Sequence, residues 1–119
     1  MPPLKRSDLL AIFAGGCAGA LVRAGLATAL PPGSGWPWAT FAVNVAGAVI
    51  LALVYDRARV RPLVGTGFCG ALTTFSAVQI ELFDMLDAGR VGLATAYGAA
   101  SLAAGYAAVL LATGLVRRA

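Results

Sequence analysis

A run of glycine and threonine interrupts an apolar stretch that is otherwise long enough to cross a lipid bilayer. Residues 65–76 read GTGFCGALTTFS, with three glycines and three threonines. Both residue types form helices poorly, and an unpaired backbone N–H or C=O costs several kcal/mol in hydrocarbon. A break at this depth is tolerated where its backbone lines a cavity or binds an ion or substrate. The run therefore predicts a membrane protein that handles a small ion.

The composition supports this class and argues against others. Of the 119 residues, 60% are hydrophobic and 12% are charged, which is about half the charged share of a soluble domain. The net charge of +4 comes from basic residues that flank apolar runs, so nucleic acid is not an expected partner. Cys17 and Cys69 lie inside apolar segments, and histidine is absent from the sequence. We expect no zinc or iron site, no disulfide framework and no nucleophile–base set that would make the chain an enzyme.

Four apolar segments each approach the ~20 residues that a transmembrane helix needs. They form one domain over residues 1–119 and cover roughly residues 9–30, 36–55, 62–86 and 91–116. We predict an all-α membrane protein with four transmembrane helices, the third of which is broken in mid-membrane. The first segment also resembles a signal peptide, but its length and the three spans that follow it favour a retained helix. Four short spans enclose little interior, so a pore would require a dimer.

Small residues recur in these segments at four-residue spacing, as at Gly15 and Gly19. This spacing puts them on one helix face, where they allow another helix backbone to approach closely. The pattern predicts a tightly packed bundle.

The basic residues fall almost entirely on one side of the predicted membrane. If the N-terminus is cytoplasmic, Arg90 is the outer loop residue, and the inner side holds Lys5, Arg6, Arg57, Arg59, Arg61, Arg117 and Arg118. Cytoplasmic loops of membrane proteins carry the excess of lysine and arginine. The sequence predicts that both termini lie in the cytoplasm.

Two polar side chains lie deep within the predicted spans. Asn44 is in the middle of the second span, and Arg23 lies past the middle of the first. The Asn44 amide either makes an interhelical hydrogen bond or donates to an anion in an aqueous vestibule. Arg23 either snorkels toward the outer interface or supplies a fixed positive charge that attracts anions. The residues alone leave these alternatives open.

Further candidates follow the break. Phe75 packs against lipid or core, or presents its electropositive ring edge to an anion. Tyr97 and Ser101 are four residues apart and share a helix face, and together with Ser76 their hydroxyls form a row along which an ion could pass. Alone, each hydroxyl more often bonds to its own helix. Glu81 is expected near the outer interface.

Three motifs of this chain, taken in order, resemble those of the fluoride channel family known as CrcB or Fluc. They are residues 15–23 (GGCAGALVR), residues 38–47 (WATFAVNVAG) and residues 67–76 (GFCGALTTFS). Their spacing and the chain length are similar to those of the family, and the resemblance covers nearly the whole sequence.

The resemblance implies a fluoride-selective channel subunit of a bacterial cell membrane that exports fluoride and lowers its cytoplasmic concentration. Family members pair antiparallel into dual-topology dimers with two pores along the interface. A structural Na⁺, which is not transported, would be held by the backbone carbonyls of Gly70 and Thr73. The resemblance places Arg23 at the vestibule and assigns to the fluoride pathway Asn44, Phe75, Ser76, Tyr97 and Ser101.

Val78 departs from the family pattern, which usually has a second phenylalanine three residues after the first. In addition, the bias of basic residues to one side opposes insertion of one chain in both directions. We therefore hypothesise an oppositely oriented homologous chain as the partner, and this chain could be the non-conducting half of such a heterodimer. A small multidrug-resistance-type proton-coupled exporter is a further alternative. It requires a carboxylate in the first helix, where this chain has only Arg23.

Overall fold

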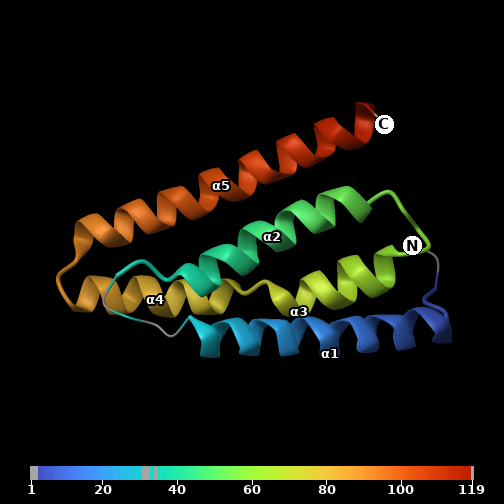
Figure 1. The fold of residues 1–119 in the computed structure, drawn as a ribbon, viewed down its shortest axis with the longest axis horizontal. Coiled ribbons are helices and arrows are strands. Elements are labelled where there is room, and N and C mark those ends of the chain that lie inside the picture. The colour runs from blue at the N-terminus through green and yellow to red at the C-terminus, as the bar shows by residue number, and fades with distance from the viewer. Residues whose placement is uncertain (1–2, 31–32, 34, 119) are drawn as a thin grey trace.

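The computed structural model describes residues 3–30, 33 and 35–118, all of whose regular structure is helical (Figure 1). The elements are α1 (Arg6–Ala29), α2 (Trp38–Val54), η1 (Arg61–Cys69), α3 (Gly70–Leu72), α4 (Phe75–Asp87) and α5 (Val91–Arg118). Within the described residues, three stretches are long and apolar enough to cross a membrane, residues 6–29, 61–87 and 91–118, and α2 is a shorter apolar helix. The predicted helical architecture is confirmed, and each observed element lies close to its predicted span.

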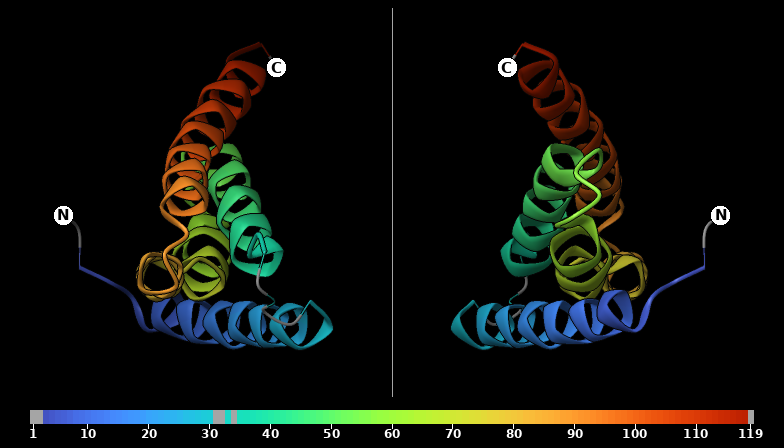
Figure 2. Two further views of the ribbon diagram at one scale, coloured as in Figure 1. Left: turned by 90° about the vertical axis from the view of Figure 1, so that its left-hand side faces the viewer. Right: turned by 90° about the vertical axis from the view of Figure 1, so that its right-hand side faces the viewer.

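The helices pack in a fixed order around the broken third segment. Helix α1 lies against η1 and α3, α2 lies against η1 and α5, and α4 lies against α5. Figures 1 and 2 show α1 and α5 on opposite sides of the molecule, with the broken segment and α2 between them. The start of α1, the α2–η1 connection and the end of α5 share one end of the bundle, and the α4–α5 turn is at the other. We call these the basic end and the turn end.

Close contact between α1 and η1 depends on glycine. A Cβ atom added at Gly15 would overlap the Leu63 carbonyl, and one added at Gly19 would overlap the Phe68 carbonyl. A Cβ on Gly67 would lie 2.5 Å from the Ile12 carbonyl oxygen. The prediction that Gly15 and Gly19 form a close packing face is therefore confirmed.

The first half of the broken segment is wound as a π-helix, which the sequence did not predict. At its end the Gly70 N–H donates to the carbonyls of Gly65 and Gly67. The second half, α4, packs on α5 through a small core of Val78, Met85, Ala94 and Tyr97. The first half therefore packs mainly on α1 and the second half mainly on α5.

Candidate ion pathway at the helix break

Two threonines form the break, and each has a separate role. Thr73 has φ −80° and ψ 150°, and Thr74 has φ −148° and ψ 117°, so both are extended. The Thr73 N–H and hydroxyl both donate to the Cys69 carbonyl, at 3.0 and 2.9 Å, and end the first half of the segment. The Thr74 hydroxyl accepts from the Ala77 N–H at 3.1 Å and caps the start of α4. The predicted interruption of the third span is confirmed and lies at Thr73–Thr74.

Asn44 of α2 clamps the extended backbone of Thr74. Its Oδ1 accepts from the Thr74 N–H at 2.8 Å, and its Nδ2 donates to the Thr74 carbonyl at 3.1 Å. The side chain therefore takes the place of a β-strand partner for one residue and satisfies both of its backbone groups. This is the interhelical alternative for Asn44, although one amide hydrogen remains for another acceptor.

The clamp also changes the bonding of Gly70. In a continuous helix the Gly70 carbonyl would accept from the Thr74 N–H, but that N–H is held by Asn44. Gly70 and Thr73 line one wall of a cavity of about 310 Å³, together with Thr66 and Arg61. Freed carbonyl oxygens at a cavity wall are suitable ligands for a hard cation.

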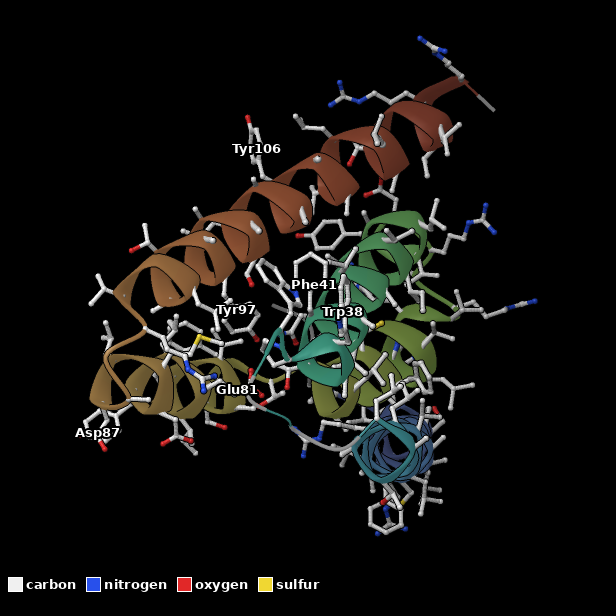
Figure 3. All side chains as sticks on the ribbon, turned by 60° about the vertical axis from the view of Figure 1, so that its left-hand side comes forward. Trp38, Phe41, Glu81, Asp87, Tyr97 and Tyr106 are labelled. Atoms are coloured by element: carbon white, nitrogen blue, oxygen red, sulfur yellow. The ribbon has the colours of Figure 1, made fainter. Side chains whose placement is uncertain are left out.

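Glu81 forms a polar node between three helices. It accepts hydrogen bonds from the Thr40 hydroxyl of α2 at 2.5 Å and from the Tyr97 hydroxyl of α5 at 2.6 Å. Tyr97 has no exposed surface, and Figure 3 shows it next to Glu81 between α4 and α5. The carboxylate of Glu81, expected near the outer interface, is thus engaged by the buried Thr40 and Tyr97 side chains.

Trp36 supports this node from the side. Its ring meets the Tyr97 ring edge to face at a centroid distance of 5.4 Å and the Phe41 ring in the same way at 5.6 Å. These contacts hold the tyrosine ring in the orientation in which its hydroxyl reaches Glu81.

A cavity of about 650 Å³ brings the break, the polar node and the predicted vestibule residue together. Thr74 and Glu81 lie in its wall, as do Thr40, Trp36 and Arg23. The rest of the lining is apolar and comes mainly from α1, α2 and the connection between them. Arg23 is thus the cationic side chain of a cavity that ends at the break and at Glu81.

Comparison with known proteins assigns the family. The profile described as "CrcB-like protein, Camphor Resistance (CrcB)" matches residues 10–113. The chain is 48% identical over 127 aligned residues to fluoride-specific ion channel FluC 1 of Mycobacterium bovis, covering 99% of this chain and 96% of the relative. It is 40% identical to fluoride-specific ion channel FluC of Bordetella bronchiseptica and 37% identical to that of Chlorobaculum tepidum, each over 92% of this chain and 91% and 94% of the relatives.

This chain belongs to the CrcB family. The resemblance that the three motifs indicated is confirmed. Membership of this channel family and the long apolar helices indicate a multi-pass membrane protein. Family membership favours a channel over the multidrug-resistance-type exporter that the helix number also allowed.

The remaining predicted residues of this CrcB subunit make no hydrogen bond with Glu81 in the described part of the chain. Phe75, the first residue of α4, is 75% exposed and Ser76 is also exposed, with its Oγ 3.2 Å from the Thr74 Oγ1. Ser101 lies one turn beyond Tyr97 on α5, and its Oγ is buried without a hydrogen-bond partner in the described part of the chain. Val78 is buried in the α4–α5 core beneath Tyr97. The structure thus joins Asn44 to the break and Tyr97 to Glu81, and it leaves Phe75 on the outer surface of the subunit.

Thr40, Thr74 and Glu81 were not singled out as site residues from the sequence. Thr40 lies four residues before Asn44, so the two share a helix face, and this spacing was a usable signal. Glu81 was recognised as an unusual acid, but its two hydroxyl partners come from positions 41 and 16 residues away in the chain.

Proposed function

We propose that this CrcB chain is one subunit of a channel through which fluoride leaves the cell. Its relatives named as fluoride-specific ion channels align with almost the whole chain. The observation that carries the proposal is the Asn44 clamp, which holds an extended backbone segment open within a membrane-spanning stretch. Such a segment has no role in simple helix packing, but the clamp frees the Gly70 carbonyl and leaves one Asn44 amide hydrogen without a protein acceptor among the described residues.

The anion would enter through the 650 Å³ cavity. Arg23 supplies positive charge in its wall, and the free amide hydrogen of Asn44 lies at the break. Ser76 and the ring edge of Phe75 would continue the path outside the subunit, and Tyr97 and Ser101 would form its hydroxyl side. Because the Tyr97 hydroxyl donates to Glu81, it becomes available to fluoride only when Glu81 releases it.

We infer that two subunits pair antiparallel. The Phe75 ring is 75% exposed, and a ring edge contributes to a pore only when a partner encloses it. The basic end carries seven lysine and arginine residues, whereas Asp84, Asp87 and Arg90 lie at the turn end. For two copies of this chain, antiparallel pairing would place the basic end of one subunit beside the more acidic end of the other.

The orientation in which this chain inserts into the membrane decides which kind of subunit can pair with it. The seven basic residues at one end favour a cytoplasmic position for both termini of this chain. An oppositely oriented homologous chain is therefore the proposed partner, with a pore in which this subunit contributes Phe75 and the partner supplies the aromatic edge that Val78 lacks.

We propose that a structural Na⁺ lies at the Gly70 and Thr73 carbonyls. The fit is supported by the loss of the helical donor to Gly70 and by the cavity that both residues line. Two carbonyl oxygens supply only part of a coordination shell, so the same two groups of the second subunit would complete it.

The test is fluoride efflux from liposomes, measured with a fluoride electrode. This chain alone and this chain with an oppositely charge-biased homologue are reconstituted in parallel. Efflux only from the mixture, lost on Phe75→Ile, supports the heterodimeric channel. Rapid efflux from this chain alone supports the channel but overturns the obligate partner. Absence of fluoride efflux from both preparations, with intact dimers, contradicts the proposed function.

A further inference from the structure

Two buried polar atoms near Tyr97 have no hydrogen-bond partner among the residues that the structure describes. They are the Nε1 of Trp36 and the Oγ of Ser101. The Trp36 ring meets the Tyr97 ring edge to face at a centroid distance of 5.4 Å, and Ser101 follows Tyr97 by about one turn of α5. Both residues therefore adjoin the same buried side chain, and each brings to it a polar group without a partner.

The Trp36 ring is held by aromatic neighbours. Besides Tyr97 it contacts the Phe41 ring edge to face at 5.6 Å, and its centroid lies 6.0 Å from that of the Trp38 ring. A ring packed in this way does not turn freely toward a new acceptor. A buried N–H without an acceptor is destabilising, so the position calls for an acceptor that the described residues do not supply.

The chemistry of the two groups favours a small anion as that acceptor. The indole nitrogen is a donor only, and the serine hydroxyl can donate one hydrogen. A water molecule would accept from both groups, but it would also need acceptors for its own two hydrogens. A halide ion accepts from every donor around it. Because both donors are uncharged, they would hold an anion less tightly than an arginine would, and the anion could leave again.

The route to this position starts in the 650 Å³ cavity. Trp36 lies in the wall of that cavity together with Arg23 and Glu81. The Nε1 atom itself is covered in the described conformation, so an anion reaches it only after a neighbouring side chain shifts. Tyr97 is the neighbour expected to move, because its hydroxyl now donates to Glu81 and must leave it to serve an anion.

We propose that Trp36 and Ser101 donate hydrogen bonds to one fluoride ion beside Tyr97. Trp36 is thereby a further ligand on the ion pathway, in addition to the residues assigned above. The choice of fluoride rests on the proposed function, whereas the two unpaired groups by themselves call for a small acceptor. Both ligands come from a single subunit, so binding at this site does not require a partner chain.

Tryptophan fluorescence tests the site directly, because the chain contains only two tryptophans. Trp38→Phe leaves Trp36 as the sole emitter of the full-length protein in micelles. A hydrogen bond from the indole N–H to an anion moves the emission to longer wavelength. We expect a saturable shift with sodium fluoride, at an ionic strength held constant with sodium gluconate, and a much smaller shift with sodium chloride.

Two hydroxyl deletions on α5, made in the Trp38→Phe background, form a matched pair. Ser101→Ala should raise the fluoride concentration at half-saturation about tenfold or more, the size expected for one hydrogen bond to a charged group. Thr95→Ala should leave it unchanged, because the Thr95 hydroxyl is exposed and donates to the Val91 carbonyl of its own helix.

A second pair measures conduction. Trp36→Phe keeps an aromatic ring against Tyr97 but removes the N–H, and it should slow fluoride efflux about tenfold in the preparation that conducts. Tyr106→Phe removes a hydroxyl from an exposed ring of α5 and should leave efflux unchanged. If Trp36→Phe fails to fold, the fluorescence experiment still decides, because it keeps Trp36 intact.

An emission that does not respond to fluoride, or that responds equally to fluoride and chloride, overturns the proposal and favours a resident water molecule at Trp36. A half-saturation that Ser101→Ala leaves unchanged overturns the shared site. Efflux without any shift of the Trp36 emission rejects the site and leaves the proposed channel standing. A saturable, fluoride-selective shift in a protein that conducts no fluoride supports the site and contradicts the channel.

Discussion

Replacement of Asn44 by leucine removes the clamp while keeping a side chain of similar size. The wild-type side chain makes two hydrogen bonds to Thr74, at 2.8 and 3.1 Å, and both are partly buried. Without them the Thr74 N–H and C=O lose their partners inside the membrane-spanning stretch. A buried polar group left unpaired costs about 1–3 kcal/mol, whereas side-chain hydrogen bonds in membrane proteins average about 0.6 kcal/mol.

We therefore expect Asn44→Leu to lower the free energy of unfolding by about 2–6 kcal/mol, because the two lost bonds each leave a backbone group unsatisfied at about 1–3 kcal/mol. The free energy is measured by denaturant titration in micelles. The same variant should lose fluoride efflux from liposomes, since the backbone at the break is no longer held extended.

Gln79→Leu is the matched control, because Gln79 is an exposed amide on α4 and its replacement removes the same chemistry away from the clamp. It should change the unfolding free energy by less than about 0.5 kcal/mol. If Asn44→Leu were as stable as Gln79→Leu and still conducted, the clamp would have no energetic role and the account of the break given above would be wrong.

Three further substitutions test other contacts. Glu81→Gln should cost about 1–2 kcal/mol, since the amide oxygen can accept from one hydroxyl but the amide nitrogen cannot accept from the other. In a double-mutant cycle with Thr40→Ala, additive losses would show that the two side chains are uncoupled. Gly19→Ala should destabilise the subunit strongly in thermal unfolding because its Cβ would overlap a carbonyl of η1, whereas Gly25→Ala, with open space around it, should be neutral or stabilising. Thr74→Ala should cost about 1 kcal/mol of helix capping and Thr74→Ser much less; equal effects of the two on the unfolding midpoint would argue against the cap.

Much of the helical layout could be predicted from the sequence because it depends on local properties. Hydropathy and length define the spans, and the predicted range 91–116 differs from α5 by two residues at its end. The break was predicted from the density of glycine and threonine, and it falls at the last two threonines of that run. The glycine spacing at residues 15 and 19 predicted close packing, although the sequence could not say that the π-helical half of the third segment is the neighbour.

The polar contacts of the site could not be predicted in the same way. Asn44 was recognised as a buried amide, but a sequence does not give the rotation of α2 relative to the broken segment, and that rotation decides whether the amide meets backbone or anion. The partners of Glu81 were missed for a similar reason. Its position along the helix is compatible with an interface, and only the approach of Thr40 and Tyr97 on two other helices makes an inward carboxylate favourable.

The charge distribution imposes opposite requirements on insertion and on pairing. Seven basic residues at one end favour a single orientation in the membrane, whereas the exposed Phe75 and the more acidic turn end favour an antiparallel neighbour. Two copies of this chain could pair antiparallel only if one of them inserted against its charge bias. Each basic residue that this moves away from an anionic inner leaflet costs about 1 kcal/mol. A homologous chain with the opposite bias would remove this conflict, because each subunit then inserts in its favoured direction with its basic residues on the cytoplasmic side. The proposed heterodimer would also account for Val78, since a pore shared between two sequences needs its aromatic edges only once.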